Sequence, residues 1–286
     1  MLDLNSILDV GAPALAFTTL LAVGLELTPA DFARVRRAPW VVAVGVLAPL
    51  VLLPAIALAL VWWIRPEPAV EAGLLLVAAC PIGGISNTYV YLARASTALS
   101  VALTGLSSVL AVGAIPVLSG VFEHVLREPL RVGAPVSILG LQLVFMLAMP
   151  LGLGMVIRRR RPAWAQASRP WFQRLAWFLL ALLLLLILTI EARRVASMLR
   201  QAVFLAMLFI AASFAAGWAA GTAARASDAD RFTLAAEFAT RNIAIATVIA
   251  VTLLGRTELA VFGSVYFLTE LPLMLAAVGA WRWRLR

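Results

Sequence analysis

The chain has 286 residues, of which 63% are hydrophobic and only 13% are charged, and its mean hydropathy is +1.00. A water-soluble protein of this length cannot bury so many apolar side chains, because its surface must be wetted. This excludes a soluble enzyme, a disordered chain and a disulfide-stapled secreted domain. The net charge is +9, and all 23 basic residues are arginines scattered between apolar runs. Such a distribution predicts membrane topology and not nucleic-acid binding.

The apolar runs predict an all-α polytopic membrane protein with about nine transmembrane helices. A helix needs about 20 apolar residues to cross the hydrocarbon core. Residues 178–190 are apolar apart from Thr189, whereas a transmembrane barrel strand would alternate. The whole chain, residues 1–286, is then one transmembrane domain with short loops. The predicted spans are residues 7–27, 40–64, 69–93, 97–121, 134–157, 171–191, 200–223, 232–254 and 258–281.

The loops on the two sides of the membrane differ in arginine content, which predicts the orientation of the chain. With nine spans, 15 arginines fall on one side and 7 on the other. The richer side is expected to be cytoplasmic, which puts the N-terminus outside, the C-terminus in the cytoplasm and His124 in an external loop. The strongest contribution comes from the arginines at positions 158–161, for which binding of lipid headgroups is the alternative role. The sequence begins without a basic region and does not resemble a cleaved signal peptide.

The third and eighth spans are interrupted. The third contains Pro81, Gly83 and Gly84, and the eighth carries Glu237 and Arg241 within an apolar run. A helix that breaks inside the bilayer leaves backbone N–H and C=O groups unpaired, and these must face protein, water or an ion. The interruptions therefore predict a site near the membrane midplane.

The two halves of the chain share a weak internal symmetry. Asn87 is followed by a helical stretch and by Pro116, 29 residues later, whereas Asn242 is followed by another such stretch and by Pro272, 30 residues later. Matching interrupted segments in two inverted halves are the best sequence indication of a transport site.

Oxygen-bearing side chains gather at these interruptions. The hydroxyls of Ser100 and Thr104 share one helical face, where they either bond to carbonyls one turn earlier or face a site. A carboxylate within a span, such as that of Glu237, is a functional candidate by default. With Ser86 and Asn87, these residues offer neutral oxygens and one negative charge, which suits Na⁺. The set contains no thiolate or imidazole for a transition metal, and Cys80 is expected to be a packing residue.

Several segments resemble the bile acid:sodium symporter family in its nine-helix form. They are CPIGGISN at 80–87, YLAR at 91–94, ALSVALT at 98–104, LTPADF at 27–32 and EFATRN at 237–242. The resemblance implies two broken helices that cross in a core domain, roughly residues 40–121 and 200–281, and a panel domain, roughly 7–27 and 134–191, that moves against it. It places the family's first sodium site on Ser86, Asn87, Ser100, Thr104 and Glu237.

The chain departs from the family at the second sodium site and in the substrate pocket. Pro49 and Arg241 stand where the second sodium site has glutamines, so the resemblance implies one sodium site. Asn242 matches an asparagine that contacts substrate. Gly84 replaces a threonine at the crossover, and Glu270 falls where some relatives have a His–Asn pair. A bile acid substrate is therefore not implied, although Asn242, Arg241, Gly84 and Glu270 remain the expected substrate-binding positions.

Arg241 is open to several interpretations. It lies one helical turn after Glu237, so the two can form an intrahelical ion pair; its guanidinium can also replace the second sodium ion, reach for an anionic substrate or pair with Glu270. Glu270 is either that partner or a proton carrier.

The sequence thus predicts a secondary transporter in the bacterial plasma membrane. It would carry a small organic anion into the cell with sodium by alternating access. The alternatives are a proton-coupled or uncoupled organic anion carrier, and a non-transporting sensor or channel on the same fold. The spans contain no Ser–His or paired-Asp arrangement, so enzymatic activity is not expected.

Overall fold

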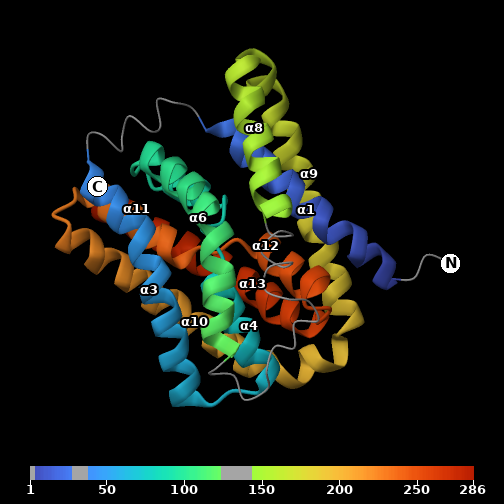
Figure 1. The fold of residues 1–286 in the computed structure, drawn as a ribbon. Coiled ribbons are helices and arrows are strands. Elements are labelled where there is room, and N and C mark those ends of the chain that lie inside the picture. The colour runs from blue at the N-terminus through green and yellow to red at the C-terminus, as the bar shows by residue number, and fades with distance from the viewer. Residues whose placement is uncertain (1–3, 28–37, 124–143) are drawn as a thin grey trace.

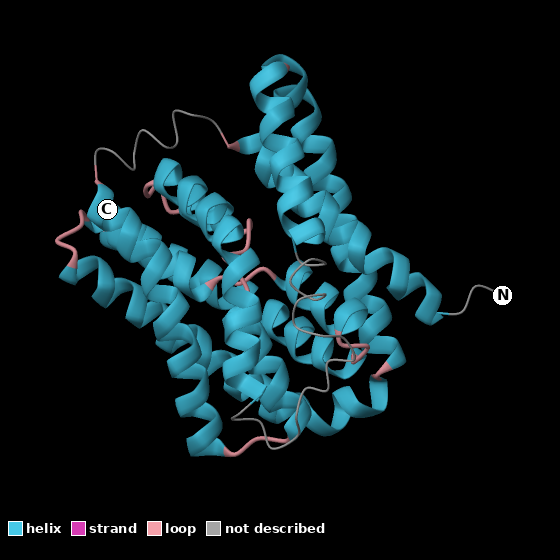
Figure 2. Cartoon of the chain, viewed as in Figure 1, coloured by secondary structure: helices cyan, strands magenta, loops and turns pink. Residues whose placement is uncertain are grey.

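The computed structural model describes residues 4–27, 38–123 and 144–286, which are almost entirely helical (Figures 1 and 2). The helices are α1 (Leu4–Glu26), α3 (Pro39–Ile64), α4 (Pro68–Ala79), α5 (Ser86–Leu92), α6 (Thr97–Glu123), α8 (Met149–Arg160), α9 (Pro162–Ile190), α10 (Ala192–Ala223), α11 (Asp228–Ala239), α12 (Ile243–Val248) and α13 (Thr257–Arg284), with π-helical turns η1 (Val144–Ala148) and η2 (Ile249–Leu253). The prediction of an all-α polytopic membrane protein is confirmed.

Four of the described helices, α3, α9, α10 and α13, are both long enough and apolar enough to cross a membrane, with mean hydropathies from 1.7 to 2.7. Shorter apolar helices cover Val10–Glu26, Pro68–Ala79, Thr97–Ala111 and Ile243–Leu253. Large apolar side chains on α3 lie on the outside of the molecule, with Trp62 78% and Val51 69% exposed. Such exposure would be unfavourable in water, whereas it is favourable in the lipid of a membrane.

Local sequence signals explain where several helices begin and end. Proline occupies the first turn of α3, α4 and α9, where its missing N–H has no helical partner to lose. Ser227 caps α11 by accepting a hydrogen bond from the Asp230 backbone N–H at 3.2 Å. The third predicted span divides into α4 and α5, and the eighth divides into α11 and α12 with η2, as the polar interruptions predicted.

The described helices form two groups. Helices α1, α8 and α9 pack on one another at the upper right of Figure 1, and the other helices surround the point where the two broken helices meet. Within the first group α1 and α8 approach closely, since a Cβ atom on Gly24 would overlap the Leu151 carbonyl oxygen. Small residues permit this close helix packing in membranes.

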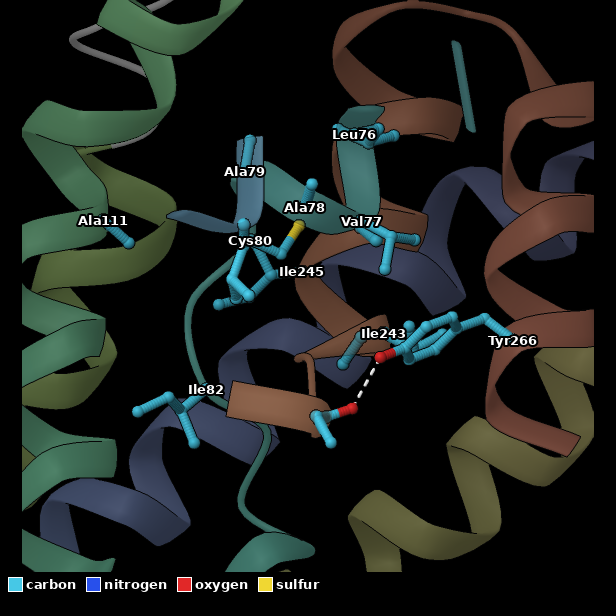
Figure 3. Close-up of a cluster of buried hydrophobic side chains, with 14 of the residues drawn as sticks. Leu76, Val77, Ala78, Ala79, Cys80, Ile82, Ala111, Ile243, Ile245 and Tyr266 are labelled. Carbon is cyan, nitrogen blue, oxygen red and sulfur yellow. Dashed lines mark hydrogen bonds between the residues drawn. The ribbon is translucent and has the colours of Figure 1, made fainter. Parts of the chain in front are cut away.

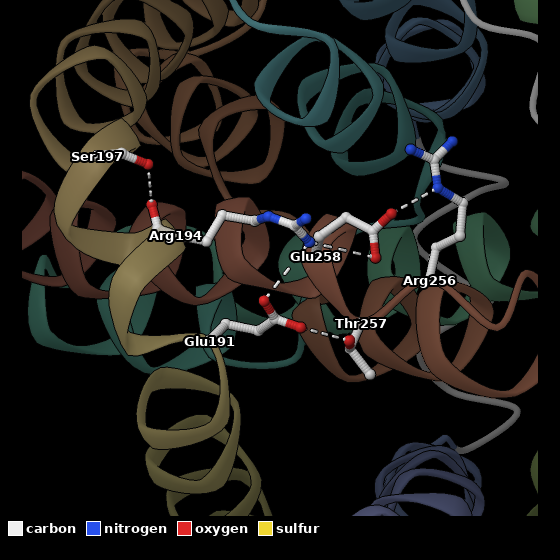
Figure 4. Close-up of polar contacts among 6 residues, drawn as sticks. All are labelled: Glu191, Arg194, Ser197, Arg256, Thr257 and Glu258. Carbon is white, nitrogen blue, oxygen red and sulfur yellow. Dashed lines mark hydrogen bonds and ion pairs between the residues drawn. The ribbon is translucent and has the colours of Figure 1, made fainter.

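A polar network ties the junction between α9 and α10 to the start of α13 (Figure 4). The Thr257 hydroxyl donates to Glu191 Oε1 at 2.7 Å, and Arg194 Nη1 lies 3.5 Å from Glu191 Oε2 and 3.8 Å from Glu258 Oε2. Arg256 Nε donates to Glu258 Oε1 at 2.8 Å. The chain therefore passes from one helix group to the other at a point that is anchored to α13.

Candidate functional site

The two broken helices cross through an antiparallel contact between their breaks. Ile82 and Arg241 form an isolated β-bridge. The Gly83 N–H donates to the Thr240 carbonyl at 3.3 Å, and the Asn242 N–H donates to the Pro81 carbonyl at 2.9 Å. Each break therefore supplies hydrogen-bond partners for the backbone of the other break, and the bilayer cannot supply them.

The glycines in the first break have different surroundings. A Cβ on Gly83 would lie 2.6 Å from the Arg241 carbonyl oxygen, so the crossing requires glycine there. A Cβ on Gly84 would have only Val23 Cγ2 nearby, at 3.9 Å. The Ile82 N–H, which directly precedes these glycines, donates to the Ser107 hydroxyl on α6 at 3.2 Å. Sequence patterns do not reveal this contact.

On the α6 side of the crossover, oxygen atoms from three helices meet. Ser100 Oγ on α6 lies 2.6 Å from Asn87 Oδ1 on α5 and also contacts Glu237 Oε1 on α11. The Thr104 hydroxyl donates to Glu237 Oε2 at 3.3 Å. The Ser86 hydroxyl faces the same carboxylate without a hydrogen bond of standard geometry. All five predicted sodium-site residues are therefore brought together.

This cluster is rich in acceptors and poor in protons. A hydroxyl carries one proton, so Ser100 cannot donate to the Asn87 carbonyl oxygen and to Glu237 at the same time. The hydroxyls of Ser100 and Thr104 point toward side chains of other helices, whereas those of Ser107 and Ser108 bond back to the Thr104 carbonyl, at 3.0 and 2.8 Å. Ser100 and Glu237 are fully buried, so their oxygens face a site inside the protein.

The structure excludes one of the interpretations of Arg241, the intrahelical ion pair with Glu237. Helix α11 ends at Ala239, and Arg241 lies in the extended break, so the two side chains are not one helical turn apart. Arg241 Nη2 instead donates to the Cys80 carbonyl, and the described residues contain no ion pair of Arg241. The residue is 3% exposed. Arg241 is not in helical geometry because the backbone of its break pairs with the backbone of the other break.

A second polar cluster lies on the α13 side of the crossover. The buried Glu270 carboxylate faces the Tyr89 hydroxyl from α5 and the backbone N–H of Arg241. The Tyr266 hydroxyl donates to the Ala239 carbonyl at 2.5 Å, within a cluster of buried side chains that also includes Ile243 and Cys80 (Figure 3). Sequence reasoning missed both tyrosines. A signal existed, since the chain has three tyrosines and these two lie inside apolar segments.

A pocket separates the crossover from the first helix group. It is a partly open cavity of about 160 Å³. Its lining includes Thr19 and Glu26 of α1, Trp177 of α9, Gly84 and Asn242 of the breaks, and Phe267 of α13. Of these, Glu26 pairs with Arg169 at 2.5 Å.

Three of the four expected substrate-binding positions line this pocket: Gly84, Arg241 and Asn242. Glu270 does not line it. The Asn242 Oδ1 accepts from the Ile245 N–H at 3.2 Å and so caps α12, and Nδ2 has no hydrogen-bond acceptor within the described residues. Pro49 is buried inside α3 and offers no side-chain oxygen. The residues at 28–32 and His124 lie outside the described part of the chain.

The family model that matches this chain is that of the sodium bile acid symporter family, over residues 12–198, which is more than half of the 286 residues. The chain belongs to this family. The matched segment contains Ser86, Asn87, Ser100 and Thr104, whereas Glu237 and Arg241 lie beyond it, so their roles rest on the geometry described above.

Curated relatives of this family have related names. The chain is 37% identical over 103 residues to "Uncharacterized sodium-dependent transporter YocS" of Bacillus subtilis (strain 168), covering 36% of this chain and 32% of that protein. It is 37% identical over 100 residues to "Probable sodium/metabolite cotransporter BASS2, chloroplastic" of Oryza sativa subsp. japonica, covering 35% and 24%. It is 30% identical over 162 residues to "Sodium-dependent organic anion transporter" of Rattus norvegicus, covering 53% and 43%. Each match spans less than half of the relative's length.

Proposed function

We propose that this protein is a secondary transporter that couples movement of a small organic anion into the cell to sodium by alternating access. The observation that carries the proposal is the buried cluster of Asn87, Ser100, Thr104 and Glu237 oxygens between α5, α6 and α11. The names of the sodium-dependent relatives support the same coupling ion. The plasma membrane of a bacterium is the proposed location, with the N-terminus outside and the C-terminus in the cytoplasm.

The chemistry of the cluster favours a hard monovalent cation such as Na⁺ over divalent cations and transition metals. Its ligands are carboxylate, amide and hydroxyl oxygens, and hard cations prefer such atoms. A divalent ion such as Ca²⁺ takes six to eight oxygens and commonly several carboxylates, whereas Glu237 is the only carboxylate of this set. Within the described residues there is no group of three or more His, Cys, Asp or Glu side chains that suits a transition metal. The proposed sodium ligands are Ser86, Asn87, Ser100, Thr104 and Glu237.

The buried charges support a single sodium ion. Glu237 and Glu270 contribute two negative charges when ionised, and Arg241 contributes one positive charge, so one Na⁺ neutralises the group. A second sodium about 4 Å from the guanidinium would be repelled by roughly 4 kcal/mol at an effective dielectric constant of about 20. Pro49 supplies no side-chain oxygen for it. We infer that Arg241 takes the place of a second ion by bracing the crossover through the Cys80 carbonyl.

The pocket is the proposed substrate site, because its walls come from both helix groups. In this proposal α1, α8 and α9 form the panel, roughly residues 7–27 and 134–191, and it moves against a core of roughly residues 40–121 and 200–281. Sodium would bring α5, α6 and α11 together and so favour the conformation of Gly84 and Asn242 that binds the anion. Such a difference in affinity between two states is what couples the two ligands.

A thermal-shift screen tests the proposal most simply. Purified protein would be heated with a panel of organic anions, in sodium chloride and in choline chloride of equal concentration. A ligand of the folded state raises the unfolding temperature, so an anion that stabilises the protein only in sodium supports coupling. Counterflow of that anion in proteoliposomes then separates a carrier, which shows trans-stimulation, from a channel. Stabilisation that is equal in choline, or uptake without trans-stimulation, would contradict the proposal.

A further inference from the structure

The Glu270 cluster lies on the opposite side of α5 from the proposed sodium site. Asn87 belongs to the sodium cluster and Tyr89 to the Glu270 cluster. Residues two apart on a helix point in different directions, so the short helix α5 contributes to both clusters. Arg241 lies between them, and it faces Glu237 and Glu270 without an ion pair to either.

The Glu270 carboxyl group is buried without adequate partners. Its side chain is 0% exposed, and neither carboxylate oxygen accepts a hydrogen bond of standard geometry within the described residues. The Tyr89 hydroxyl faces it but also lacks such a hydrogen bond. The guanidinium of Arg241 is committed to the Cys80 carbonyl through Nη2. An ionised carboxylate inside a membrane is costly unless it is paired and hydrogen-bonded, and a proton removes that cost.

The pocket lies close to this cluster. Phe267 lines the pocket one helical turn before Glu270 on α13, Thr88 lines it next to Tyr89, and Arg241 lines it directly. The Glu270 cluster therefore lies directly behind the residues that line the pocket. A hydronium ion in the pocket would transfer its proton to a Glu270 carboxylate oxygen, leaving a neutral carboxylic acid and a water molecule.

We propose that Glu270, held against Tyr89, Tyr266 and Arg241, is a proton-binding site whose occupancy alternates with that of sodium. The other groups that face this cluster in the described residues are the Cys80 thiol at the end of α4 and, through Arg241, Glu237 on α11. With both carboxylates ionised the buried group carries one net negative charge. Either Na⁺ at Glu237 or a proton on Glu270 brings this to zero, whereas both together leave it positive.

This charge balance gives the proton a role in the transport cycle. A carrier that has released sodium would return with Glu270 protonated, so that its core remains neutral within the membrane. Rebinding of sodium would then expel the proton. This role rests on the proposed sodium site, although protonation of Glu270 itself does not.

Infrared difference spectroscopy tests the protonation of Glu270 in sodium-free buffer. As the pH is lowered, the purified protein should gain the C=O stretching band of a buried carboxylic acid. That band should be absent from Glu270→Gln, whereas in Glu237→Gln it should appear only at a lower pH, because Arg241 then already balances the charge of the Glu270 carboxylate. Glu258→Gln is the matched control, since this carboxylate on the same helix pairs with Arg256. Tyr89→Phe, which keeps the carboxyl group, should shift the titration midpoint. A band that survives in Glu270→Gln, or a midpoint unaffected by Tyr89→Phe, would overturn the proposal.

Proton release on sodium binding tests the alternation. In weakly buffered solution with a pH dye, each sodium bound should release up to one proton, and the sodium dissociation constant should rise by up to about tenfold per pH unit below the midpoint. Glu270→Gln should bind sodium without releasing protons. Undiminished release in that variant would assign the proton to Glu237 and refute the inference. A wild-type protein without any sodium response would refute the sodium site, while the infrared band would still decide whether Glu270 binds a proton.

Discussion

Gly83 and Arg241 are in direct backbone contact where the broken helices cross, and a Cβ on Gly83 would lie 2.6 Å from the Arg241 carbonyl oxygen. We expect Gly83→Ala to lower the unfolding temperature, because the new methyl group would meet a backbone carbonyl that cannot move aside. Overpacking of this kind costs about 1–3 kcal/mol. Gly84→Ala is the matched control, since its Cβ would meet only Val23 Cγ2 at 3.9 Å. Thermal unfolding in detergent compares the two variants, and equal unfolding temperatures would contradict the crossing.

Removal of a neutral oxygen from the proposed sodium site should weaken sodium binding without abolishing it. Ser100→Ala and Thr104→Val each remove one hydroxyl that contacts Glu237. A loss of about 1 kcal/mol per contact corresponds to roughly fivefold weaker affinity. Ser264→Ala serves as the control, because that hydroxyl donates to the Ala260 carbonyl of its own helix at 2.9 Å. Tryptophan fluorescence during sodium titration would measure the affinities, and an effect of Ser264→Ala as large as that of Ser100→Ala would argue against these ligands.

The sodium stoichiometry should be one. Arg241 would repel a second sodium ion and Pro49 offers it no side-chain oxygen. Sodium binding should therefore be hyperbolic, with a Hill coefficient near one. Arg241→Gln should lower the unfolding temperature, since it removes the positive charge near Glu237 and Glu270 and the contact with the Cys80 carbonyl. Adding Pro49→Gln is expected to permit a second ion and to raise the Hill coefficient. A clearly sigmoidal sodium response in the unmutated protein would refute the single-ion account.

The orientation can be checked by labelling single cysteines. After Cys80→Ala removes the native thiol, a cysteine at Arg159 should react with a membrane-impermeant reagent only from the cytoplasm. A cysteine at His124 should react only from outside. The reverse pattern would overturn the predicted orientation, and labelling of both positions from one side would overturn the number of spans between them.

Much of the architecture follows from hydrophobic patterning. Apolar runs of spanning length place α3 and α13 close to their observed bounds, and Pro81, Gly83 and Gly84 mark the break between α4 and α5. Helices α9 and α10 begin 9 and 8 residues before their predicted spans, because each starts in a more polar segment. These features are local, so sequence alone contains them. The resemblance adds the pairing of distant residues: Ser100 and Glu237 are 137 residues apart, and neither pattern nor spacing joins them.

The orientation of Arg241 could not be predicted in this way. Its spacing from Glu237 is helical, but the second break begins before it, and the pairing of Arg241 with Ile82 depends on a segment 159 positions earlier in the chain. The roles of Ser107, Tyr89 and Tyr266 were missed for the same reason, because each contacts a different helix across the crossover. Tertiary contacts decide which polar groups in an apolar segment meet.

Direct binding of radioactive sodium to the purified protein tests the central claim, that Glu237 and the surrounding oxygens hold the coupling ion. The unmutated protein should bind about one sodium ion per chain at saturation, displaceable by unlabelled sodium chloride and not by choline chloride. Glu237→Gln preserves the shape of the side chain and removes the only carboxylate of the set, so it should lose this binding, whereas Glu258→Gln on α13 should retain it. Unchanged sodium binding by Glu237→Gln would contradict the account.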